Sequence, residues 1–390
     1  MPIGVAHPPL STEALIIGGG PAGLAAAIAL RQRGIDCTVV EARETAIDKA
    51  CGEGLMPDSR ETLARLGVTL QASDGFLFRG IRFSNAAHSV HARFPEAAGI
   101  GVRRPRLHML LTERARQTGA TLLFNSRVQL PANEHATRDR DGYQTATVNV
   151  EPIRFRWLIG ADGQASSVRR WAGLEDVKKC SMRYGFRTHY QVSPWSEYVE
   201  VHWGPKGQLY VTPVGDESVC VVYITRDPRC NRANVLAEFP EVAAHLHGAE
   251  IASQQRGAVT ATRKLRSVAT SSVALIGDAS GSADAITGEG LAISFRQALA
   301  LADSIAAGSL DYYRAEHSGL SRLAHTMGAL MLTMDGWPAL QDRALCTLAH
   351  NPAVFRELLH AHMGHRRLPA VVLRRAAGFG WRLLIQGAPA

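Results

Sequence analysis

Residues 13–30, EALIIGGGPAGLAAAIAL, decide the fold. A short apolar run ends directly at a cluster of glycines, and an alanine-rich run of good helix formers follows it. Gly18, Gly20 and Gly23 have the spacing G-x-G-x-x-G. In this setting the first glycine permits a tight turn, the second lets the backbone approach a pyrophosphate, and the third lets the helix pack closely on the strand. The stretch therefore predicts a strand, a turn and a helix that bind a dinucleotide.

A second apolar run, IDCTVV at residues 35–40, supports the same site because it ends at Glu41, 18 positions after Gly23. An acidic residue at this place accepts hydrogen bonds from the adenosine ribose, and the free N–H groups at the helix start face the phosphates. Ala22 within the turn is a further candidate for cofactor binding. Arg43 either reaches the adenosine or is a surface charge, and the sequence favours neither.

The composition is that of a globular chain. The 390 residues are 46% hydrophobic and 20% charged, which excludes wholesale disorder, collagen and coiled coil. Glycine is enriched at 36 residues, and the excess lies in a few clusters. The net charge of +8 comes mostly from residues 341–390, which hold seven Arg against two acidic residues. Because no run of five basic residues occurs, we do not expect nucleic acid as a partner.

The six cysteines include no C-x-x-C pair and no zinc-type spacing with histidine. We therefore expect free thiols in a reducing compartment and no metal site. The N-terminus has no basic segment before its first apolar run, and no run reaches the 18 apolar residues that span a bilayer. The expected location is the cytoplasm.

Two later strands also end at glycine-containing turns. Residues 157–159 lead to Asp162 and Gly163, and residues 272–276 lead to Gly277 and Asp278. With Gly18, these junctions imply one cofactor that three separate parts of the chain contact. Other expected elements of this domain are helices over 58–66, 104–118 and about 291–307 and a strand over 121–128.

Residues 177–268 differ from the rest because short alternating stretches are separated by Gly, Pro and Asp, a pattern typical of an antiparallel sheet. We expect an α/β fold, α+β overall, in which a discontinuous Rossmann-type domain carries this sheet as an insertion. The predicted cofactor domain comprises 1–80, 100–176 and 269–310, the substrate domain 81–99 and 177–268, and a C-terminal helical region 311–390.

These residues resemble the glutathione-reductase-like FAD proteins, and within them the branch of aromatic hydroxylases (flavin monooxygenases), flavin halogenases and geranylgeranyl reductases. The resemblance covers about residues 13–310. It rests on three motifs in the family order, which are GGGPAG at 18–23 with Glu41, IGADGQASSVRR at 159–170 and VALIGDASGSADAITGEGLAISFRQA at 273–298. It implies that the dinucleotide is FAD and that the chain is an oxidoreductase.

The resemblance also implies roles for single residues. Asp278 would hold a ribitol hydroxyl, and Asp162 with Gly163 would touch FAD. The turn from Gly288 to Gly290 would lead a helix, with Leu291 in its first turn, whose N-terminus points at the flavin. Such a terminus carries about half a positive charge and stabilises anionic reduced flavin.

Two further positions match family features outside these motifs. Arg104 precedes Leu107 and Leu111 in an Arg-x-x-Leu-x-x-x-Leu pattern, and the resemblance implies that its side chain contacts the phosphate or ribityl region. The neighbours Arg103 and Arg106 are the less favoured choices. Val128 falls where the family lays backbone against adenine.

The segment KACGEG at residues 49–54 resembles the Cys-Gly-rich loop of the reductase branch, which passes beside the isoalloxazine. Glycines allow a backbone to approach a planar ring closely, and Gly54 is therefore a cofactor candidate. Cys51 and Glu53 are candidate catalytic residues, and Glu53 can act as an acid or base if it is buried. The alternative, equally weighted, is that Cys51 packs and Glu53 is solvated.

Departures from the relatives bear on the chemistry. The Trp-x-Trp-x-Ile-Pro signature of halogenases is absent. The run GQLYVTP at residues 207–213 keeps the Gly and Pro of the prenyl reductase stretch but has Tyr210 in place of Trp. Tyr210 is a candidate catalytic residue and His202 a second pocket candidate, although the alternation of a strand leaves either face open for each.

The leading hypothesis is an FAD-dependent monooxygenase that hydroxylates a small aromatic or hydrophobic substrate through a flavin C4a-hydroperoxide, in the manner the resemblance implies. The alternative is a flavin-dependent reductase of an isoprenoid or other double bond, and an alternative of another class is a non-enzymatic FAD-binding protein. Because the chain has a single dinucleotide fingerprint, NAD(P)H would visit the flavin transiently as electron donor, or a separate reductase would deliver electrons.

The basic C-terminal stretch, residues 366–386, pairs apolar residues with Arg. It is expected to form a helix that caps the substrate domain. Contact with an anionic membrane surface, through which a lipid-like substrate would arrive, is the less favoured alternative.

Overall fold

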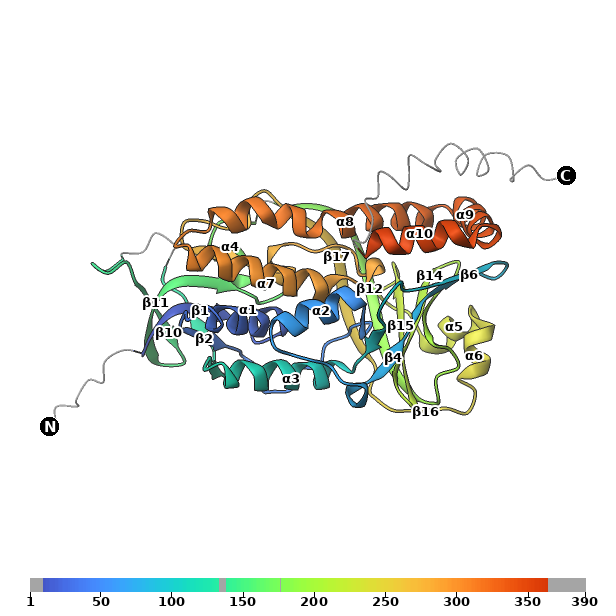
Figure 1. The fold of residues 1–390 in the computed structure, drawn as a ribbon, viewed down its shortest axis with the longest axis horizontal. Helices are drawn as coiled ribbons and strands as arrows, with labels where there is room; N and C mark the ends of the chain where they lie inside the picture. Colours follow the sequence, from blue (N-terminus) through green and yellow to red (C-terminus); the bar gives the residue numbers. More distant parts are fainter. Residues whose placement is uncertain (1–9, 133–137, 176, 364–390) are drawn as a thin grey trace.

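The computed structural model describes residues 10–132, 138–175 and 177–363. Its two large sheets lie side by side, with long helices over both of them (Figure 1). The first is a seven-stranded sheet in the order β8-β2-β1-β11-β10-β9, with β18 paired to β11. Its strands are β1 (Leu10–Ile17), β2 (Cys37–Val40), β8 (Thr121–Leu123), β9 (Val128–Gln129), β10 (Gln144–Val148), β11 (Glu151–Gly160) and β18 (Val273–Leu275).

The centre of this sheet is parallel. β1 pairs with β2 on one side and with β11 on the other, and β18 extends the parallel set beyond β11. Parallel strands are normally covered on both faces, so they read as continuous apolar runs. The residues Ala14, Leu15 and Ile16 of β1 are fully buried. All three predicted strand-to-turn junctions therefore lie at the same edge of one sheet, the carboxyl ends of β1, β11 and β18.

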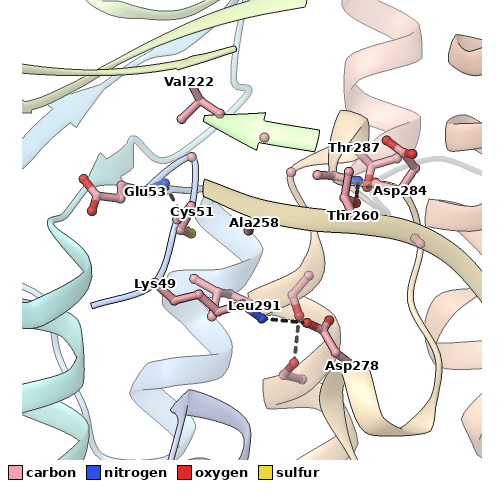
Figure 2. Close-up of a pocket in the computed structure, with 18 of the residues that line it drawn as sticks. Lys49, Cys51, Glu53, Val222, Ala258, Thr260, Asp278, Asp284, Thr287 and Leu291 are labelled. Carbon is pink, nitrogen blue, oxygen red and sulfur yellow. Dashed lines mark hydrogen bonds and ion pairs between the residues drawn. The ribbon is translucent and has the colours of Figure 1, made fainter. Parts of the chain in front are cut away.

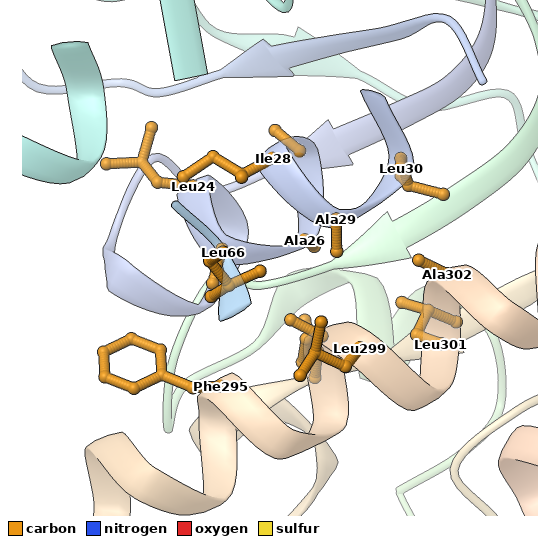
Figure 3. Close-up of a cluster of buried hydrophobic side chains, with 14 of the residues drawn as sticks. Leu24, Ala26, Ile28, Ala29, Leu30, Leu66, Phe295, Leu299, Leu301 and Ala302 are labelled. Carbon is orange, nitrogen blue, oxygen red and sulfur yellow. The ribbon is translucent and has the colours of Figure 1, made fainter. Parts of the chain in front are cut away.

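The core on one face of this sheet is built by helices from opposite ends of the chain. α1 (Pro21–Arg31) packs against α7 (Gly290–Ala306), and α2 (Pro57–Arg65) and α3 (Arg104–Gln117) lie beside them (Figure 3). Ala26 and Ala29 of α1 face α7 and allow a close approach, while Leu24 and Ile28 lie on the side of α1 that points away from α7 (Figure 3). Each fully buried Leu or Ile contributes roughly 1.5–3 kcal/mol.

The second sheet has eight strands in the order β16-β12-β15-β14-β13-β5-β6, with β17 paired to β12. All its pairings are antiparallel except β5 with β13, as expected for hairpin-linked strands. The strands are β5 (Gly80–Ser84), β6 (Ser89–Arg93), β12 (Val177–Gln191), β13 (Tyr198–Trp203), β14 (Gly207–Gly215), β15 (Ser218–Thr225), β16 (Glu250–Ile251) and β17 (Arg256–Leu265).

A small three-stranded sheet and several short helices fill the remaining junctions. The small sheet is β3 (Gly54–Leu55), β7 (Gly99–Gly101) and β4 (Phe76–Phe78), and it contacts β14. The short helices are η1 (Ala72–Asp74), α4 (Ser167–Trp171), α5 (Arg232–Ala237), α6 (Pro240–His245), η2 (Gly277–Ser280) and η3 (Ala285–Thr287).

Three helices follow α7 and cover the second sheet. α8 (Asp311–Gly336) runs along α7 and reaches past it, where α9 (Pro338–His350) and α10 (Pro352–His362) pack against β6 (Figure 1). No helix in residues 10–363 that the structure describes is long and apolar enough to cross a bilayer. The predicted basic stretch at 366–386 lies outside the described residues.

The α/β class with a mixed sheet arrangement is confirmed, whereas some predicted elements were wrong in detail. The strand expected over 121–128 is two strands, because Asn125 adopts φ +51 and its N–H donates to the carbonyl of Arg43. Residues 232–245, expected within a sheet region, form α5 and α6. The division of the chain into domains stays a prediction.

Candidate active site

One large cavity of about 1430 Å³ lies where the first sheet, the second sheet and the C-terminal helices meet. One end is lined by the three strand-to-turn junctions of the first sheet, and the other end by β5, β13 and the helices α8 to α10. The cavity therefore joins the predicted cofactor site to the second sheet without a wall between them.

The glycines of the turn after β1 have two different roles. Some allow close packing of the backbone, and one leaves space for a ligand. A Cβ atom on Gly23 would lie 1.9 Å from the Gly18 carbonyl oxygen, and one on Gly18, which has φ +110, would lie 2.4 Å from the Ala161 carbonyl oxygen. At Gly20 a Cβ atom would meet no atom within 4 Å, and the residue lines the cavity. Gly18 and Gly23 are needed for the turn itself, while Gly20 keeps space open above it.

The start of α1 fits an anion. No side chain caps its first turn, and no acidic residue stands there. Two to three N–H groups of an uncapped helix start remain available for phosphate oxygens. The donor set at this turn therefore fits the pyrophosphate of a dinucleotide.

Glu41 lies at the end of β2, where backbone N–H groups hold its carboxylate. Gly19 N–H donates to Oε2 at 2.8 Å and Arg43 N–H donates to Oε1 at 2.9 Å. Each oxygen keeps a lone pair for a ribose hydroxyl. Arg43 is exposed at the cavity wall, and Val128, the first residue of β9, lines the same end.

His108 contacts the glycine turn after β1, and this contact was not predicted from the sequence. Its buried Nε2–H donates to the Gly19 carbonyl oxygen at 2.9 Å. Burial lowers the pKa of His108, so the imidazole is neutral. The signal was its position one helical turn after Arg104 on α3.

Asp162 has its carboxylate occupied by the helix that follows it. The hydroxyl groups of Ser166 and Ser167 and the N–H groups of Ser167 and Val168 all donate to it, at 2.5 to 3.2 Å. Asp162 therefore accepts from the first N–H groups of α4, whose N-cap residue is Ser166. It nevertheless lines the cavity together with Gly163, which has φ +79.

Asp278, one residue after Gly277, faces the cavity and forms an ion pair with Lys49, whose Nζ lies 3.3 Å from Oδ2 (Figure 2). Both side chains are more than a third exposed, so the pair contributes about 0–1 kcal/mol, and a ligand hydroxyl can compete for Asp278. Gly277 lies behind the wall, where a Cβ atom would be 2.8 Å from the Cβ of Ala22.

The start of α7 is a second uncapped helix end at the cavity. Gly288 is left-handed, with φ +67, and Glu289 at the N-cap makes no side-chain cap. A Cβ atom on Gly290 would meet nothing within 4 Å, and both Gly290 and Leu291 line the cavity. The partial positive charge of this helix end therefore meets open space.

Arg104 lines the cavity at the first residue of α3. Its buried Nε has no hydrogen-bond partner among the described residues, and an unpaired buried donor is costly unless a ligand satisfies it. By contrast, Arg106 donates to Asp74 at 2.7 Å. Arg103 also has a buried Nε without a hydrogen-bond partner among the described residues, but it does not line the cavity. Of the three neighbouring arginines, Arg104 therefore combines an unpaired donor with a place in the cavity wall.

The loop of residues 48–54 lines the cavity, and Figure 2 shows Lys49, Cys51 and Glu53 on it. Cys51 is half-buried there, and its Sγ accepts from Glu53 N–H at 3.5 Å. Glu53 adopts φ +60 and points its carboxylate away from Cys51 and Leu291 (Figure 2). The two candidate catalytic residues thus point in different directions from one loop.

Glu53 is 2% exposed and fully hydrogen-bonded. Oε2 accepts from His189 Nε2 at 2.6 Å, and Oε1 accepts from Arg104 N–H at 2.9 Å and from Arg187 Nη1 at 3.0 Å. Burial raises the pKa of Glu53, but the bonds from His189 and Arg104 and the charge of Arg187 outweigh it and hold the pKa below 4.5. Glu53 is therefore an ionised residue that joins the loop to β12.

A metal ion fits this cluster poorly. Ligand atoms of Glu53, His189 and Cys220 lie within 4.8 Å of one another, all buried. However, Glu53 and His189 are hydrogen-bonded to each other, and the guanidinium of Arg187 contacts the same carboxylate. A cation would have to displace both bonds and would stand beside a fixed positive charge.

Tyr210 on β14 lines the cavity and donates its hydroxyl to the Ile286 carbonyl oxygen at 3.2 Å. Burial raises the pKa of Tyr210, so it stays a neutral phenol. A buried ion pair between Arg183 of β12 and Asp284 holds the same segment. His202 instead contacts Ser84 at 2.8 Å and Glu200 at 3.1 Å, away from the cavity.

Most predicted site residues are brought to one cavity. Gly23 and Gly277 lie behind its wall, where they pack against neighbouring backbone and side chains. The predicted residues in the wall are Gly18, Gly20, Ala22, Glu41, Arg43, Cys51, Glu53, Gly54, Arg104, Val128, Asp162, Gly163, Tyr210, Asp278, Gly288, Gly290 and Leu291.

The free cysteines among the described side chains are Cys37, Cys51, Cys220, Cys230 and Cys346. The side chain of Cys180 lies outside the described part of the chain. Burial raises the pKa of Cys220, whose thiol lies 3.7 Å from the Cys51 carbonyl oxygen. Cys51 is thus the thiol that reaches the cavity wall.

Comparisons with known proteins agree with this geometry. A family model described as "FAD binding domain" matches residues 11–311. Menaquinone reductase of Mycobacterium tuberculosis is 30% identical over 224 residues, 54% of each chain. Digeranylgeranylglycerophospholipid reductase of Methanosarcina acetivorans is 25% identical over 302 residues, 72% of this chain and 71% of that one. Hispidin-3-hydroxylase of Neonothopanus nambi is 29% identical over 227 residues, 53% of this chain and 52% of that one.

A solved flavoprotein/dehydrogenase of Cytophaga hutchinsonii shares the fold, with a TM-score of 0.80 at 17% identity, 96% of this chain and 99% of that one. The chain spans about half the length of the first curated relatives it matches.

Proposed function

This chain belongs to the family of FAD binding domain proteins and is an FAD-dependent oxidoreductase, and from that premise we propose that it is a monooxygenase that hydroxylates an aromatic or hydrophobic substrate. The reaction would consume the substrate, O₂, NAD(P)H and a proton, and yield the hydroxylated product, NAD(P)⁺ and water. Bound FAD supplies the reducing equivalents to O₂ and the oxygen transfer.

The residues that would hold FAD follow from the cavity wall. The uncapped start of α1 would take the pyrophosphate, with the Arg104 side chain as a further donor to it or to the ribityl chain. Glu41 would accept from the adenosine ribose, and Asp278, after release from Lys49, from the ribityl hydroxyl groups. The start of α7 would face the pyrimidine edge of the flavin and stabilise its reduced anion.

The observation that carries the proposal is the apolar half of the cavity. Its walls come from the inner face of the second sheet, including Val199 and Val201, and from apolar residues of α8 to α10. A hydrophobic chamber that opens on the cofactor end excludes water from the reacting atoms, and this favours oxygen transfer over the unproductive release of H₂O₂.

Reduction of a double bond is the second candidate, and a specific observation favours it. Cys51 lines the cavity on a loop that resembles the reductase branch, and the curated relatives include a menaquinone reductase and a digeranylgeranylglycerophospholipid reductase. In that reaction the substrate would gain two hydrogens, with hydride from reduced FAD and a proton from solvent or a side chain, and O₂ would not be consumed.

The experiment is NAD(P)H oxidation by the FAD-loaded protein with a panel of phenolic and isoprenoid compounds, in air and under nitrogen, with product masses. We expect turnover to require O₂ and the product to gain one oxygen atom. Equal rates under nitrogen with a gain of two hydrogens would replace the monooxygenase by the reductase. NAD(P)H is part of the proposal, and a flavin that only a separate reductase can reduce would overturn that part alone.

We also propose that the protein is located in the cytoplasm and that the chain has three parts, a cofactor domain, a substrate domain and a C-terminal helical region. The free thiol of Cys51 at the cavity suits a reducing compartment. The domain division is supported by a cofactor end built from the first sheet and a substrate end built from the second. Limited proteolysis tests the division. The boundaries at residues 80, 100 and 177 lie in strands, so the first cut is expected near residue 268, between β17 and β18, and should leave the fragments on either side intact.

A further inference from the structure

The helices α8, α9 and α10 each present one regular stripe of residues to the cavity. The stripe positions follow the i, i+3, i+4, i+7 spacing of a single helix face. They are Met327, Leu330, Met331 and Met334 on α8, Ala344, Leu345 and Leu348 on α9, and Phe355, Leu358, Leu359 and His362 on α10. His362 is therefore a polar residue at a position where every other member of the three stripes is apolar.

His362 is placed for a partner that the described residues do not supply. Its side chain is 11% exposed, and its Nδ1 is buried with no hydrogen-bond partner among residues 10–363 that are described. The atom closest to a partner is Nε2, which lies 3.9 Å from Glu289 Oε2, too far for a hydrogen bond. A buried polar group without a partner costs free energy that a bound ligand can recover.

Other buried histidines in the described chain do have partners. His108 donates to a carbonyl oxygen at 2.9 Å, His189 contacts Glu53 at 2.6 Å and Ser253 at 2.7 Å, and His202 contacts Ser84 at 2.8 Å. These three are satisfied core residues. His362 differs from them both in lacking a bond and in lining the cavity.

Glu289 is the second unsatisfied group at this place. It is 3% exposed, and its buried Oε2 also has no hydrogen-bond partner among the described residues. Arg296 Nη2 lies 3.8 Å from Glu289 Oε1, whereas Nη1 of the same guanidinium forms an ion pair with Asp58 at 2.9 Å. Burial raises the pKa of Glu289, while the charges of His362 and Arg296 act against this. Two polar side chains, each with a buried atom that has no hydrogen bond, thus lie 3.9 Å apart at one end of an apolar chamber.

The position of Glu289 fixes where this polar end lies. Glu289 immediately precedes Gly290, the first residue of α7 and a lining residue of the predicted flavin site. His362 therefore lies where the apolar chamber meets the cofactor end. A substrate whose polar group is bound there would place its apolar part along the stripes of α8 to α10.

We propose that His362 is a substrate-binding residue that hydrogen-bonds a hydroxyl group at one end of an otherwise long, apolar substrate, and that Glu289 is the residue that positions it. The inference deepens the proposed function, on which it rests, by naming the substrate class as a hydroxyl-bearing hydrophobe. An imidazole N–H can donate a hydrogen bond to the hydroxyl oxygen, and an unprotonated imidazole nitrogen can accept one from the hydroxyl group.

The test uses the FAD-loaded protein and two matched probes, 4-octylphenol and octylbenzene, which differ by one hydroxyl. Binding is followed by the change in the flavin absorption spectrum, so turnover is not required. We expect the wild-type protein to bind octylphenol about tenfold or more tightly than octylbenzene, because a good hydrogen bond in a dry site contributes about 1.4 kcal/mol.

The matched variants are His362→Phe and His350→Phe, the latter at an exposed position of α9. We expect His362→Phe to lose the preference for octylphenol and to bind octylbenzene as the wild type does, while His350→Phe keeps the preference. Glu289→Gln should weaken binding of octylphenol a few-fold and leave octylbenzene unchanged, whereas a merely structural role would weaken both.

A wild-type protein that binds both probes equally, or a His362→Phe variant that keeps the preference, would overturn the role of His362 and leave the proposed monooxygenase standing. Binding of neither probe would contradict the role of His362 together with the apolar substrate class. O₂-independent turnover with an intact preference would overturn the monooxygenase alone.

Discussion

At the scale of single residues, Gly20 and Gly23 belong to one turn but are needed for different reasons. Gly23 has no room for a side chain because the Gly18 carbonyl oxygen is in the way. Gly20 has room, and the room is the cavity. A substitution at Gly23 therefore disturbs the fold, whereas a substitution at Gly20 disturbs what the fold binds.

We expect Gly20→Ala to fold with an unchanged Tm in the absence of cofactor and to bind FAD about tenfold or more weakly, since the methyl group would stand in the pyrophosphate space. Flavin fluorescence quenching gives the affinity. Gly319→Ala is the control, because a Cβ atom there also meets nothing within 4 Å but the residue lies on α8 away from the cavity wall. Equal FAD affinity in the two variants would contradict the assignment.

We expect the carboxylate of Glu53 to stabilise the folded protein. The Glu53→Gln substitution removes the negative charge that the positive groups around residue 53 contact. Breaking a buried charged network in this way lowers the free energy of unfolding by about 3 kcal/mol. Because the pKa of Glu53 is depressed in the folded protein, its contribution is complete above its usual value of 4.5 and is lost as pH falls through the lower folded value.

Urea unfolding at several pH values tests this expectation. The difference in unfolding free energy between wild type and Glu53→Gln should be largest near pH 7 and should shrink below pH of about 4.5. Ser253→Ala, which removes a neighbour of the same histidine without removing a charge, is the matched control. A difference that grows on acidification would show that Glu53 is protonated in the folded state.

At the scale of elements, the stripes of α8 to α10 form one wall of the apolar chamber, and the size of their side chains determines how wide the chamber is. Leu358 is half-buried and lines the cavity. We expect Leu358→Trp to raise KM, or the dissociation constant of octylphenol, about tenfold while the FAD content stays unchanged, because the ring narrows the chamber and not the cofactor end.

Arg356→Trp supplies the control for this substitution, since Arg356 is exposed on the same helix and does not line the cavity. Flavin absorbance at purification and the octylphenol titration separate the two ends of the cavity. Loss of FAD in Leu358→Trp with normal probe binding in the remaining holoprotein would contradict the division of the cavity into a cofactor end and a substrate end.

Elements with local signals could be predicted from the sequence. β13 and β15 lie within residues 177–268, where alternation and bounding turn residues predicted an antiparallel sheet. α6 was missed although Pro240 stands at its first position, a signal that also fits a turn. The break at Asn125 was missed because it depends on a hydrogen bond to Arg43, 82 residues earlier in the chain.

In the candidate site, too, the residues with local sequence signals could be predicted and the contacts between distant segments could not. Residues on the three glycine-containing turns were predicted because each turn has its own local pattern. The partners Glu53 with Arg187 and Arg183 with Asp284 are 134 and 101 residues apart, and nothing in one segment signals the other. The polar break in an apolar stripe at His362 was readable from helical spacing, but only once the stripe was known to face a cavity.

At the scale of the whole molecule, FAD would add contacts between parts of the chain that the first sheet already pairs through backbone hydrogen bonds. Ligand present at 100 times its dissociation constant stabilises a protein by about 2.7 kcal/mol. We therefore expect saturating FAD to raise the Tm by about 3 °C or more. FMN and ADP, which each fill part of the cavity, should raise it less.

Differential scanning fluorimetry of the protein freed of flavin provides the measurement. An equal rise with FMN would mean that the glycine turn and Glu41 do not contact the adenylate half. An equal rise with ADP would mean that the flavin half adds nothing, and in that case the helix start at Gly290 does not face the ring.

The pairing of α1 with α7 also bears on how the chain is made. The ion pair between Arg33, just after α1, and Asp303 of α7 joins residues 270 positions apart. At a synthesis rate of about 5–20 residues per second, the buried face of α1 waits roughly 10–50 s on the ribosome before its packing partner emerges. During that interval the alanine-rich face is a binding surface for chaperones, and slower translation of the region before residue 290 would lengthen the exposure. Yield in cells is therefore expected to fall when chaperones are limiting during synthesis.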